Sequence, residues 1–457
     1  MNRRTQSLDM VNGPLLKNMF IFAVPLMLSS LLQMLFNSAD TVIVGKFSGQ
    51  EALAAVGATG SIVFFLTAIF NGLSVGANVV IARMIGRGEP DGIHSAVHTS
   101  YFIAIAGGIL MILIGQVFSK QMLTLVATPA NIIDRSILYM RIFFAGSIFM
   151  MVYNFGAAVL RSDGDTTRPT IFLAISGVLN VLLNLFFVVV LEMSVAGVAI
   201  ATVISQAVAA FLVTIALIRN EGVIKLYPKQ ISFDKKMARD IISIGLPAGL
   251  QGMMFSISNV VVQSGVNSFG SAVVAGNSAA ANIEGYVYIG TGAFTQAAIT
   301  FTGQNAGAGN VENIKRIMLT TLWLTIVSGI AIGFLGWYKG EFFMSIFTNS
   351  EEVIQAGMYR LFWVCMFLFL NGIMDVYVSS LRGMGYSTLP TLLTMTGICG
   401  VRLAYLGLYF PLHHELSYLY ICFPLSWTVT SILQAIPSAH GTGSRWETLP
   451  DGRSSTA

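Results

Sequence analysis

The stretch LRSDGDTTRPT at residues 160–170 has a second copy in the chain, LRGMGYSTLPT at residues 381–391. Leu, Arg, Gly, Pro and Thr keep their places in both copies, and the second copy follows the first at almost half the length of the chain. The same shift in numbering aligns GRG at residues 86–88 with GAG at residues 307–309. Two motifs that lie far apart in the chain and keep one shift indicate an internal duplication.

The rest of the chain is consistent with two repeated halves. Pro25 matches Pro247 and Phe47 matches Phe269 when the shift is lengthened by one position, which requires a single-residue length difference near the first loop. The longest polar interruption, residues 219–236 with four lysines, falls almost at mid-chain. A linker between two halves is expected at this place.

Composition predicts that the duplicated halves lie in a membrane. Of the 457 residues 55% are apolar and 10% are charged, whereas a soluble domain carries about 25% charged residues. The mean hydropathy is +0.74. A membrane helix needs about 20 apolar residues, and this criterion predicts twelve spans, at residues 18–44, 52–80, 93–118, 132–160, 168–190, 193–218, 238–264, 272–301, 313–337, 353–381, 389–410 and 415–436. The first apolar run is too long for a signal peptide.

The distribution of Lys and Arg predicts the orientation of these spans. Eighteen of the 25 basic residues fall on loops of one side, and Arg402 falls inside a span. The six on the other side are Lys46, Lys120, Arg135, Arg141, Lys339 and Arg360. The positive-inside rule then places both termini in the cytoplasm and the protein in the cell (cytoplasmic) membrane. We expect the following organisation: a cytoplasmic N-terminus (1–17), an N-lobe (18–218), a cytoplasmic linker (219–237), a C-lobe (238–436) and a polar, disordered tail (437–457).

The predicted fold class is therefore an all-α integral membrane protein with twelve transmembrane helices in two parallel six-helix repeats. Both repeated loops lie on the cytoplasmic side, and six is an even number, so the halves have the same orientation. Parallel repeats of this kind are typical of alternating-access transporters with a site between the halves.

Several kinds of site and partner are not supported by the sequence. Cys365, Cys399 and Cys422 form no disulfide or zinc pattern, and the dispersed basic residues predict no nucleic-acid partner. His94 with His98, and His413 with His414 and Glu415, have no further ligands nearby, so no metal site is expected there. The chain has no GxxxxGK[ST] phosphate loop. We expect no ATP binding and no cofactor, and an ion gradient as the energy source.

Polar side chains inside the first half are candidates for an ion site. An ionisable group in mid-membrane costs roughly 2.5–3.5 kcal/mol or more, so each one suggests a function. Asp40 shares a helical face with Gln33 and Asn37. The remaining candidates are two pairs at one-turn spacing, Asn180 with Asn184 and Thr202 with Gln206. These groups offer oxygen ligands to a hard cation or hydrogen bonds to a carboxyl group; an interfacial Asp and ordinary interhelical hydrogen bonds are the alternatives.

The second half contains other candidates. Asn371, Asp375 and Ser379 repeat every four residues, Glu284 lies in the eighth span, and Arg402 is the expected countercharge of the two acids. The arrangement is either a structural ion pair or a pair that a proton switches. Asp40, Glu284 and Asp375 would map onto Val262, Val63 and Asn154, so the acids do not follow the duplication.

A substrate cavity is expected where polar and adaptable apolar side chains share the spans. Methionine and phenylalanine provide an adaptable apolar surface, although most such residues pack in cores or face lipid. The candidates that we assign to this cavity are Gln33, Asn37, Gln206, Met253, Phe255, Asn259 and Gln263.

Across residues 12–436 the chain resembles the multidrug and toxic compound extrusion (MATE) transporters, and within them the DinF-like, bacterial multidrug branch. The resemblance rests on residues 25–40, 82–88 and 160–169 and on the second-half run from ANIEG at 281–285 to TGQNAG at 302–307. It implies two six-helix lobes that form a V around a central cavity, open to alternate sides and exchange Na+ or H+ for cationic or amphipathic drugs.

The resemblance also implies site residues. In DinF-like members an N-lobe cluster takes the coupling cation, and the matching residues are Asp40, Asn180, Asn184 and Thr202. Asn184 stands where those members often carry a second Asp, which weakens the case for tight Na+ binding. NorM-like members have a Glu and an Asp where this chain has Phe255 and Asn371, so that C-lobe site is not transferred; Asp375 and Glu284 are candidates to substitute for it.

The sequence thus predicts a cation-coupled (H+ or Na+) antiporter that exports small amphipathic or cationic organic compounds, as drugs or toxic metabolites, by alternating access. Its partners would be these compounds and membrane lipid, with the chain acting as a monomer. A flippase for lipid-linked oligosaccharides would need a strongly basic cavity, and only Arg402 is plainly intramembrane and basic. An integral membrane enzyme would need clustered catalytic groups, which the spans do not contain.

Overall fold

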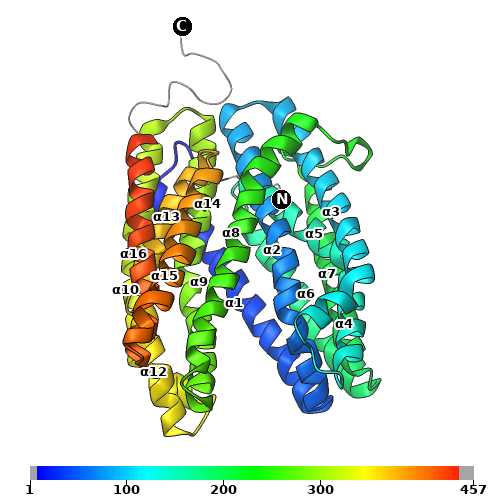
Figure 1. The fold of residues 1–457 in the computed structure, drawn as a ribbon. Helices are drawn as coiled ribbons and strands as arrows, with labels where there is room; N and C mark the ends of the chain where they lie inside the picture. Colours follow the sequence, from blue (N-terminus) through cyan, green and yellow to red (C-terminus); the bar gives the residue numbers. More distant parts are fainter. Residues whose placement is uncertain (1–7, 442–457) are drawn as a thin grey trace. The chain divides into compact units, whose positions relative to one another are not determined.

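The computed structural model describes residues 8–441, and these residues are helical along most of their length, with no strand among them (Figure 1). The α-helices are α1 (Leu15–Phe47), α2 (Gln50–Arg87), α3 (Pro90–Leu125), α4 (Ile133–Ala145), α5 (Ser147–Ser162), α6 (Thr167–Asn184), α7 (Ser194–Ile218), α8 (Lys235–Asn267), α9 (Ser271–Gly307), α10 (Val311–Tyr338), α11 (Gly340–Ser345), α12 (Glu351–Cys365), α13 (Leu368–Gly383), α14 (Thr388–Thr394), α15 (Val401–Ala404) and α16 (Leu416–Gly441). Three π-helical turns (Leu185–Val190, Met395–Gly400, Tyr405–Tyr409) and two 3₁₀ turns (Pro228–Gln230, Phe410–Leu412) complete them.

All twelve predicted spans correspond to helical segments. Nine segments in the described part of the chain are long and apolar enough to cross a membrane. Two bent pairs, α4 with α5 (47°) and α12 with α13 (41°), bring this number to eleven. The twelfth segment is α9, which is 37 residues long but contains Asn277, Glu284 and several threonines and glycines. Asn277 and Glu284, which lower the hydropathy of α9, are buried inside the protein.

Residues 8–441 form two compact units. Residues 8–9 and 24–249 form one, the N-unit, and residues 10–23 and 250–441 form the other, the C-unit. These units differ from the expected lobes at 18–218 and 238–436, because the division falls inside α1 and inside α8. The polar tail expected from residue 437 is helical as far as Gly441, and residues 442–457 lie outside the described part of the chain.

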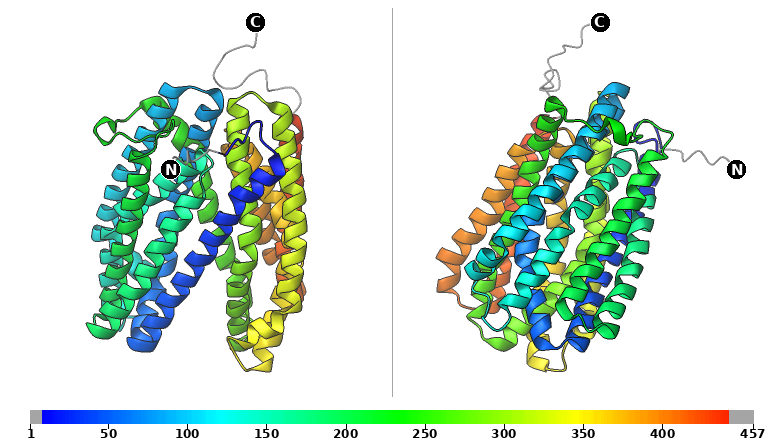
Figure 2. Two further views of the ribbon diagram at one scale, coloured as in Figure 1. Left: turned by 180° about the vertical axis from the view of Figure 1, so that it is seen from behind. Right: turned by 90° about the vertical axis from the view of Figure 1, so that its right-hand side faces the viewer.

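Glycines explain why the first part of α8 belongs to the N-unit. A Cβ atom at Gly72 of α2 would lie 2.2 Å from the backbone nitrogen of Gly249, and one at Gly76 would lie 2.3 Å from the carbonyl oxygen of Ile241. The two helices therefore touch backbone to backbone, which only glycine permits. In the rest of the N-unit α3 packs on α4 and α5, and α7 on α5 and α6 (Figures 1 and 2).

Aromatic contacts hold the first part of α1 in the C-unit. The ring of Phe20 meets that of Phe294 edge-on at 5.5 Å, and the ring of Phe22 meets that of Phe301 edge-on at 5.7 Å. Such pairs contribute roughly 0.5–1.5 kcal/mol each beyond the area that they bury. In the rest of the C-unit α9 packs on α10, α12 and α13, and α16 packs on α12 and α13 (Figure 2).

The duplicated loop motifs have the same backbone conformation in both copies. Gly164 and Gly385 have φ angles of 93° and 95°, and Gly88 and Gly309 have φ angles of 64° and 71°. Residues other than glycine rarely adopt such positive values, so each repeated glycine is required by its turn. The duplication predicted from the sequence is thus a duplication of chain geometry.

The predicted linker is attached to α3 by specific side chains. The Asp234 carboxylate accepts hydrogen bonds from the backbone nitrogens of Lys236 (2.8 Å) and Met237 (3.1 Å) at the start of α8 and from the Ser95 hydroxyl (2.8 Å). The His98 ring accepts a hydrogen bond from the backbone nitrogen of Tyr227 at 3.1 Å. Asp234 therefore caps α8 and connects it to α3.

We predict that Gly76→Ala destabilises the N-unit by about 1–3 kcal/mol, because the added methyl group would overlap the α8 backbone. Gly57→Ala, on the same helix α2, is the matched control, since a Cβ there meets nothing within 4 Å. Thermal unfolding of the purified protein would measure both. Equal unfolding midpoints for the two variants would contradict the close α2–α8 contact.

We predict that Asp234→Ala weakens the attachment of the linker, with a cost of about 1 kcal/mol for loss of the cap. The hydrogen bond from the Met237 backbone nitrogen, and then that from the Ser95 hydroxyl, lower the pKa of Asp234 below its ordinary value of 3.8. The unfolded chain therefore binds a proton before the folded one, so this stabilisation is present above pH 3.8 and is lost as the pH falls through the folded pKa. Unfolding of parent and variant at pH 7 and pH 3 would measure this, and a stability difference that does not shrink at pH 3 would contradict the capping role.

Candidate functional site

The predicted N-lobe residues other than Asn184 line one cavity of the N-unit, and Asn184 contacts Asp40 at this cavity. This cavity has a volume of about 60 Å³. A single water requires about 10–15 Å³, so the cavity has room for a few waters or an ion. The residues that line it come from α1, α6 and α7 and are Gln33, Phe36, Asn37, Asp40, Leu173, Ser176, Gly177, Asn180, Thr202, Ser205 and Gln206.

A chain of hydrogen bonds connects the four predicted ion-site residues. The Asn184 side-chain nitrogen donates to Asp40 Oδ1 at 2.5 Å and to Asn180 Oδ1 at 3.2 Å. The Asn180 side-chain nitrogen in turn donates to the Thr202 hydroxyl at 3.5 Å. The i,i+4 spacing of Asn180 and Asn184 places both amides on one face of α6, toward α1 and α7. A π-helical turn, Leu185–Val190, begins directly after Asn184; such turns are frequent at functional sites.

Two buried amide oxygens of α6 and α7 have no hydrogen-bond donor. They are Asn184 Oδ1 and Gln206 Oε1. Buried polar atoms in proteins nearly always have a partner, and an unpaired acceptor costs roughly 1–3 kcal/mol. Gln206 lines the same cavity as Asp40, and Asn184 contacts Asp40 through its nitrogen, so a cation bound in this part of the N-unit would find oxygen atoms on α1, α6 and α7.

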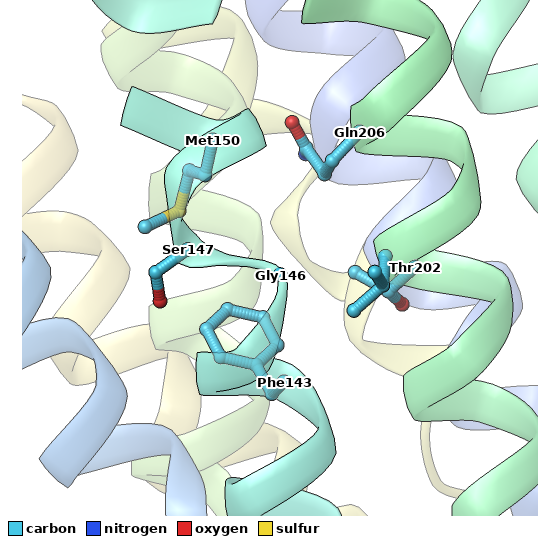
Figure 3. Close-up of a pocket in the computed structure, with 7 residues that line it drawn as sticks. Phe143, Gly146, Ser147, Met150, Thr202 and Gln206 are labelled. Atoms are coloured by element: carbon cyan, nitrogen blue, oxygen red, sulfur yellow. The ribbon is translucent and has the colours of Figure 1, made fainter. Parts of the chain in front are cut away.

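A second, smaller cavity adjoins the first. It measures about 20 Å³ and shares Thr202 and Gln206 with the larger cavity. Figure 3 shows Phe143, Ser147 and Met150 on one side, across the bend at Gly146, and Thr202 and Gln206 on α7 opposite them. The two cavities together bring polar groups and a mixed aromatic and thioether surface to the same part of the N-unit.

Glu284 in α9 is paired with Arg360, which the distribution of basic residues assigns to an outer loop. The Arg360 guanidinium of α12 makes two hydrogen bonds to the Glu284 carboxylate, at 2.6 and 2.7 Å. Only 13% of the Arg360 side chain and 8% of that of Glu284 are exposed. Arg360 Nη1 also donates to Asn277 Oδ1 at 2.7 Å. The expected Glu284–Arg402 pairing is therefore wrong, because Arg360 reaches Glu284 directly with bidentate geometry.

Arg402 has other partners. Its Nε donates to the Ser426 hydroxyl at 3.0 Å, and its Nη1 approaches the Ser258 hydroxyl at 3.4 Å and Asn259 Oδ1 at 3.3 Å. The guanidinium lies over the Phe423 ring, 4.4 Å from its centre. Within residues 8–441 no carboxylate forms an ion pair with Arg402.

Asp375 is held by its own helix. The Asn371 side-chain nitrogen donates to Asp375 Oδ2 at 2.9 Å, as the four-residue spacing predicts. Arg382, one of the duplicated motif residues, lies on the same helix and attracts this carboxylate electrostatically. Its Nη2 donates to Gln251 Oε1 at 2.8 Å.

The predicted cavity residues are distributed over different surroundings. Gln33, Asn37 and Gln206 line the N-unit cavity around Asp40, whereas Asn259 and Gln263 line a cavity of the C-unit. Met253 is buried. Phe255 packs against a cluster of buried apolar residues that includes Val262, Phe410 and Trp427. The structure therefore places these last two side chains in packing positions.

The histidines make contacts other than metal ligation. The ring of His94 is 2.8 Å from Gln230 Oε1, and the ring of His414 stacks on that of Phe269 at 4.4 Å. No group of three or more His, Cys, Asp or Glu side chains within residues 8–441 could hold a metal ion.

Sequence reasoning missed Arg360 and Asn277. The available signal was the spacing of Asn277 and Glu284, which lie two helical turns apart and therefore on one face of α9. Arg360 was assigned to a loop although it falls within the predicted span 353–381. An acid and an arginine that both fall inside spans are expected to pair.

Comparisons with known proteins agree with this architecture. Multidrug resistance proteins of bacteria are similar to the chain. It is 27% identical over 377 residues to the probable multidrug resistance protein YpnP of Bacillus subtilis, covering 82% of this chain and 84% of that protein. It is 25% identical over 392 residues to the probable multidrug resistance protein NorM of Thermotoga maritima, covering 85% and 84% respectively.

Solved structures share the fold. A MOP superfamily transporter from Pyrococcus furiosus superimposes with a TM-score of 0.90 at 22% identity, covering 98% of this chain and 100% of that one. A MATE protein in the straight conformation superimposes with a TM-score of 0.90 at 22% identity, covering 97% and 100%. At this identity the likeness concerns the fold.

The profile of the MatE family matches residues 25–186 and 247–406, once in each half of the chain. These two matches cover both copies of the duplicated loop motif and most of the twelve spans. The all-helical fold, the internal repeat and the two matches lead to one conclusion: the chain belongs to the MatE family and is a MATE transporter.

Proposed function

We propose that this protein exports small amphipathic or cationic organic compounds and that H+ or Na+ moves inward in exchange, through the site around Asp40. The observation that carries the proposal is the contact of the Asp40 carboxylate with Asn184 beside a cavity that is lined by Asp40 and by Gln206, whose side-chain oxygen is unpaired. Relatives that cover most of the chain are named multidrug resistance or multidrug export proteins. Their names support the export of organic compounds.

The ion has a physical role in this scheme. A charged carboxylate inside a membrane bundle is costly, and binding of a proton or cation at Asp40 removes that cost. Two properties of the site bear on the choice of ion. Its single acid is sufficient for a proton, and the oxygens of Asn180, Asn184, Thr202 and Gln206 are the ligands that Na+ requires.

The helix that carries Asp40, α1, also contains a proline, at which a helix bends most easily. Pro25 lies inside α1, where its ring removes one backbone hydrogen bond, and the division between the compact units falls just before it. The Thr170 hydroxyl donates to the Pro25 carbonyl oxygen at 2.8 Å. We propose that ion binding at Asp40 changes the bend of α1 at this proline and so couples the ion to the alternating opening of the transporter.

We propose that the six-helix segments 18–218 and 238–436 act as the two lobes, that both termini face the cytoplasm, and that a single chain in the cell membrane is the working unit. Energy comes from the ion gradient, without ATP. The partners are the exported compounds and membrane lipid.

We predict that Asp40→Asn abolishes dye efflux driven by a proton or sodium gradient, because a neutral amide cannot release and rebind the ion. The measurement is dye export in proteoliposomes with each gradient imposed separately, and the gradient that drives the parent protein identifies the ion. Asp134→Asn, at an exposed acid in the first turn of α4, is the matched control and is expected to retain efflux. Efflux by Asp40→Asn at the parent rate would refute the assignment of Asp40.

We predict that Asn184→Asp increases the cation affinity of the site by at least tenfold. It replaces the amide that donates to Asp40 with a second carboxylate at contact distance, and two such carboxylates stabilise a cation or a shared proton between them. The Na+ concentration and the pH at half-maximal efflux would measure the effect. Unchanged values of both would show that Asn184 lies outside the ion pathway.

A further inference from the structure

The C-unit contains a cavity that is larger than the one around Asp40 and has a different chemistry. Its volume is about 360 Å³, within the range of roughly 300–1,000 Å³ that is usual for small-molecule sites. The residues that line it come from α8, α9, α12 and α16 and are Asn259, Val262, Gln263, Asn277, Ser278, Ala281, Arg360 and Phe423.

The hydrogen-bond polarity of this cavity is set by Arg360. A guanidinium can only donate, so Asn277 turns its oxygen toward Arg360 Nη1 at 2.7 Å, and the Tyr420 hydroxyl donates to the same oxygen at 3.1 Å. Asn277 must then donate onward, to Gln263 Oε1 at 2.9 Å. Gln263 in turn donates to Asn267 Oδ1 at 2.9 Å. Asn277 Oδ1 thereby accepts two hydrogen bonds and Gln263 Oε1 accepts one, while the side-chain nitrogens of Asn277 and Gln263 each keep one N–H for a ligand.

A second arginine imposes the same polarity on Asn259. Arg402 Nη1 approaches Asn259 Oδ1 at 3.3 Å, which leaves the Asn259 amide nitrogen as the group that this residue offers to the cavity. Arg360 makes one hydrogen bond from each of Nε, Nη1 and Nη2, so its Nη1 and Nη2 each keep an N–H for a ligand. The cavity therefore offers donors from three side chains.

The charge beside the cavity is positive. Glu284 offsets Arg360, and Asp375 and Arg382 act on one another. Arg402 has hydroxyl and amide partners, no carboxylate within residues 8–441 forms an ion pair with it, and the like-charged Arg360 lies near enough to act on it electrostatically. A buried charge without a countercharge is costly inside a membrane protein. A negatively charged group in the cavity would reduce this cost.

We infer that the C-unit cavity binds the carboxylate of an amphipathic organic compound, with the carboxylate on the N–H groups of Arg360, Asn259 and Gln263. The apolar part of the compound lies against Val262, Ala281 and Phe423. This site is separate from the cation site at Asp40, since all its residues belong to the C-unit. It rests on the proposed function in one respect, namely that the bound compound is one that the protein exports, and it extends the substrates to zwitterions and organic anions.

Asn259→Asp provides a sharp test, because it is nearly isosteric and gives Arg402 a countercharge within the protein. The purified full chain in phosphatidylcholine nanodiscs is titrated with three fluorescent probes that differ only in charge: dansylglycine, its neutral amide and the cationic N-dansylethylenediamine. The parent is expected to bind dansylglycine about ten- to a hundredfold more tightly than the neutral amide, as charge-assisted hydrogen bonds predict. Asn259→Asp is expected to lose this preference and to favour the cationic probe.

The controls separate this site from a general effect of charge and from the coupling site. Asn131→Asp adds the same charge at an exposed turn and is expected to keep the parent's preference. Asp40→Asn is expected to bind dansylglycine as the parent does, so failure of coupled efflux and failure of this site are distinguishable. If Asn259→Asp does not fold, Arg402→Gln removes the charge instead and is expected to cause the same loss.

Three results would overturn the inference. One is equal affinity of the parent for the three probes. Another is an unchanged preference for dansylglycine in the folded Asn259→Asp or Arg402→Gln protein, which would leave Arg402 with a purely structural role. The third is displacement of dansylglycine by phosphatidylglycerol added to the nanodiscs, which would assign the cavity to lipid head groups.

Discussion

The dominant constraint on this protein is that hydrocarbon supplies no hydrogen bonds, so polar groups on the spans must find partners within the protein. Glu284 and Arg360 meet this requirement through two short hydrogen bonds, and Asn371 and Asp375 through one. At two places where the requirement is met incompletely, a cavity is present. Gln206 keeps an unpaired oxygen in the cavity that Asp40 lines, and Asn184, which contacts Asp40, keeps another. Arg402, which contacts Asn259 of the C-unit cavity, has no ion-pair partner within residues 8–441.

The two halves repeat their backbone but not their chemistry. The glycines at 164 and 385 have nearly equal φ angles, and the π-helical turns Leu185–Val190 and Tyr405–Tyr409 overlap when the halves are aligned on the duplicated loop motif. Before the first turn the chain has Asn184, which contacts an acid; near the second it has Arg402, which contacts hydroxyls and an amide. The same loop and helix geometry can be formed with many different side chains. The two halves could therefore keep one backbone while one acquired an acidic site and the other a basic one.

Close packing sets where the compact units divide. Gly72 and Gly76 of α2 allow α8 to approach to backbone contact, while Phe20 and Phe22 of α1 meet aromatic rings of α9. Each half therefore contributes the beginning of its first helix to the unit formed mainly by the other half. The prolines Pro25 and Pro247 lie close to these divisions, where a missing backbone hydrogen bond makes a helix easiest to bend.

Helical periodicity is local, and the sequence determined what depends on it: twelve apolar segments, an internal duplication, and the shared faces of Asn180 with Asn184 and of Asn371 with Asp375. The meeting of Asp40 with Asn184 followed from family resemblance and is now seen as a contact between α1 and α6. Ion-pair choice was not accessible in this way: the sequence predicted Arg402 as the partner of Glu284, and the packing of α9 against α12 brings Arg360 to it instead. The division inside α1 and α8, and the unpaired position of Arg402, were likewise decided by tertiary structure, since a distance between side chains on different helices depends on how those helices pack and not on their spacing along the chain.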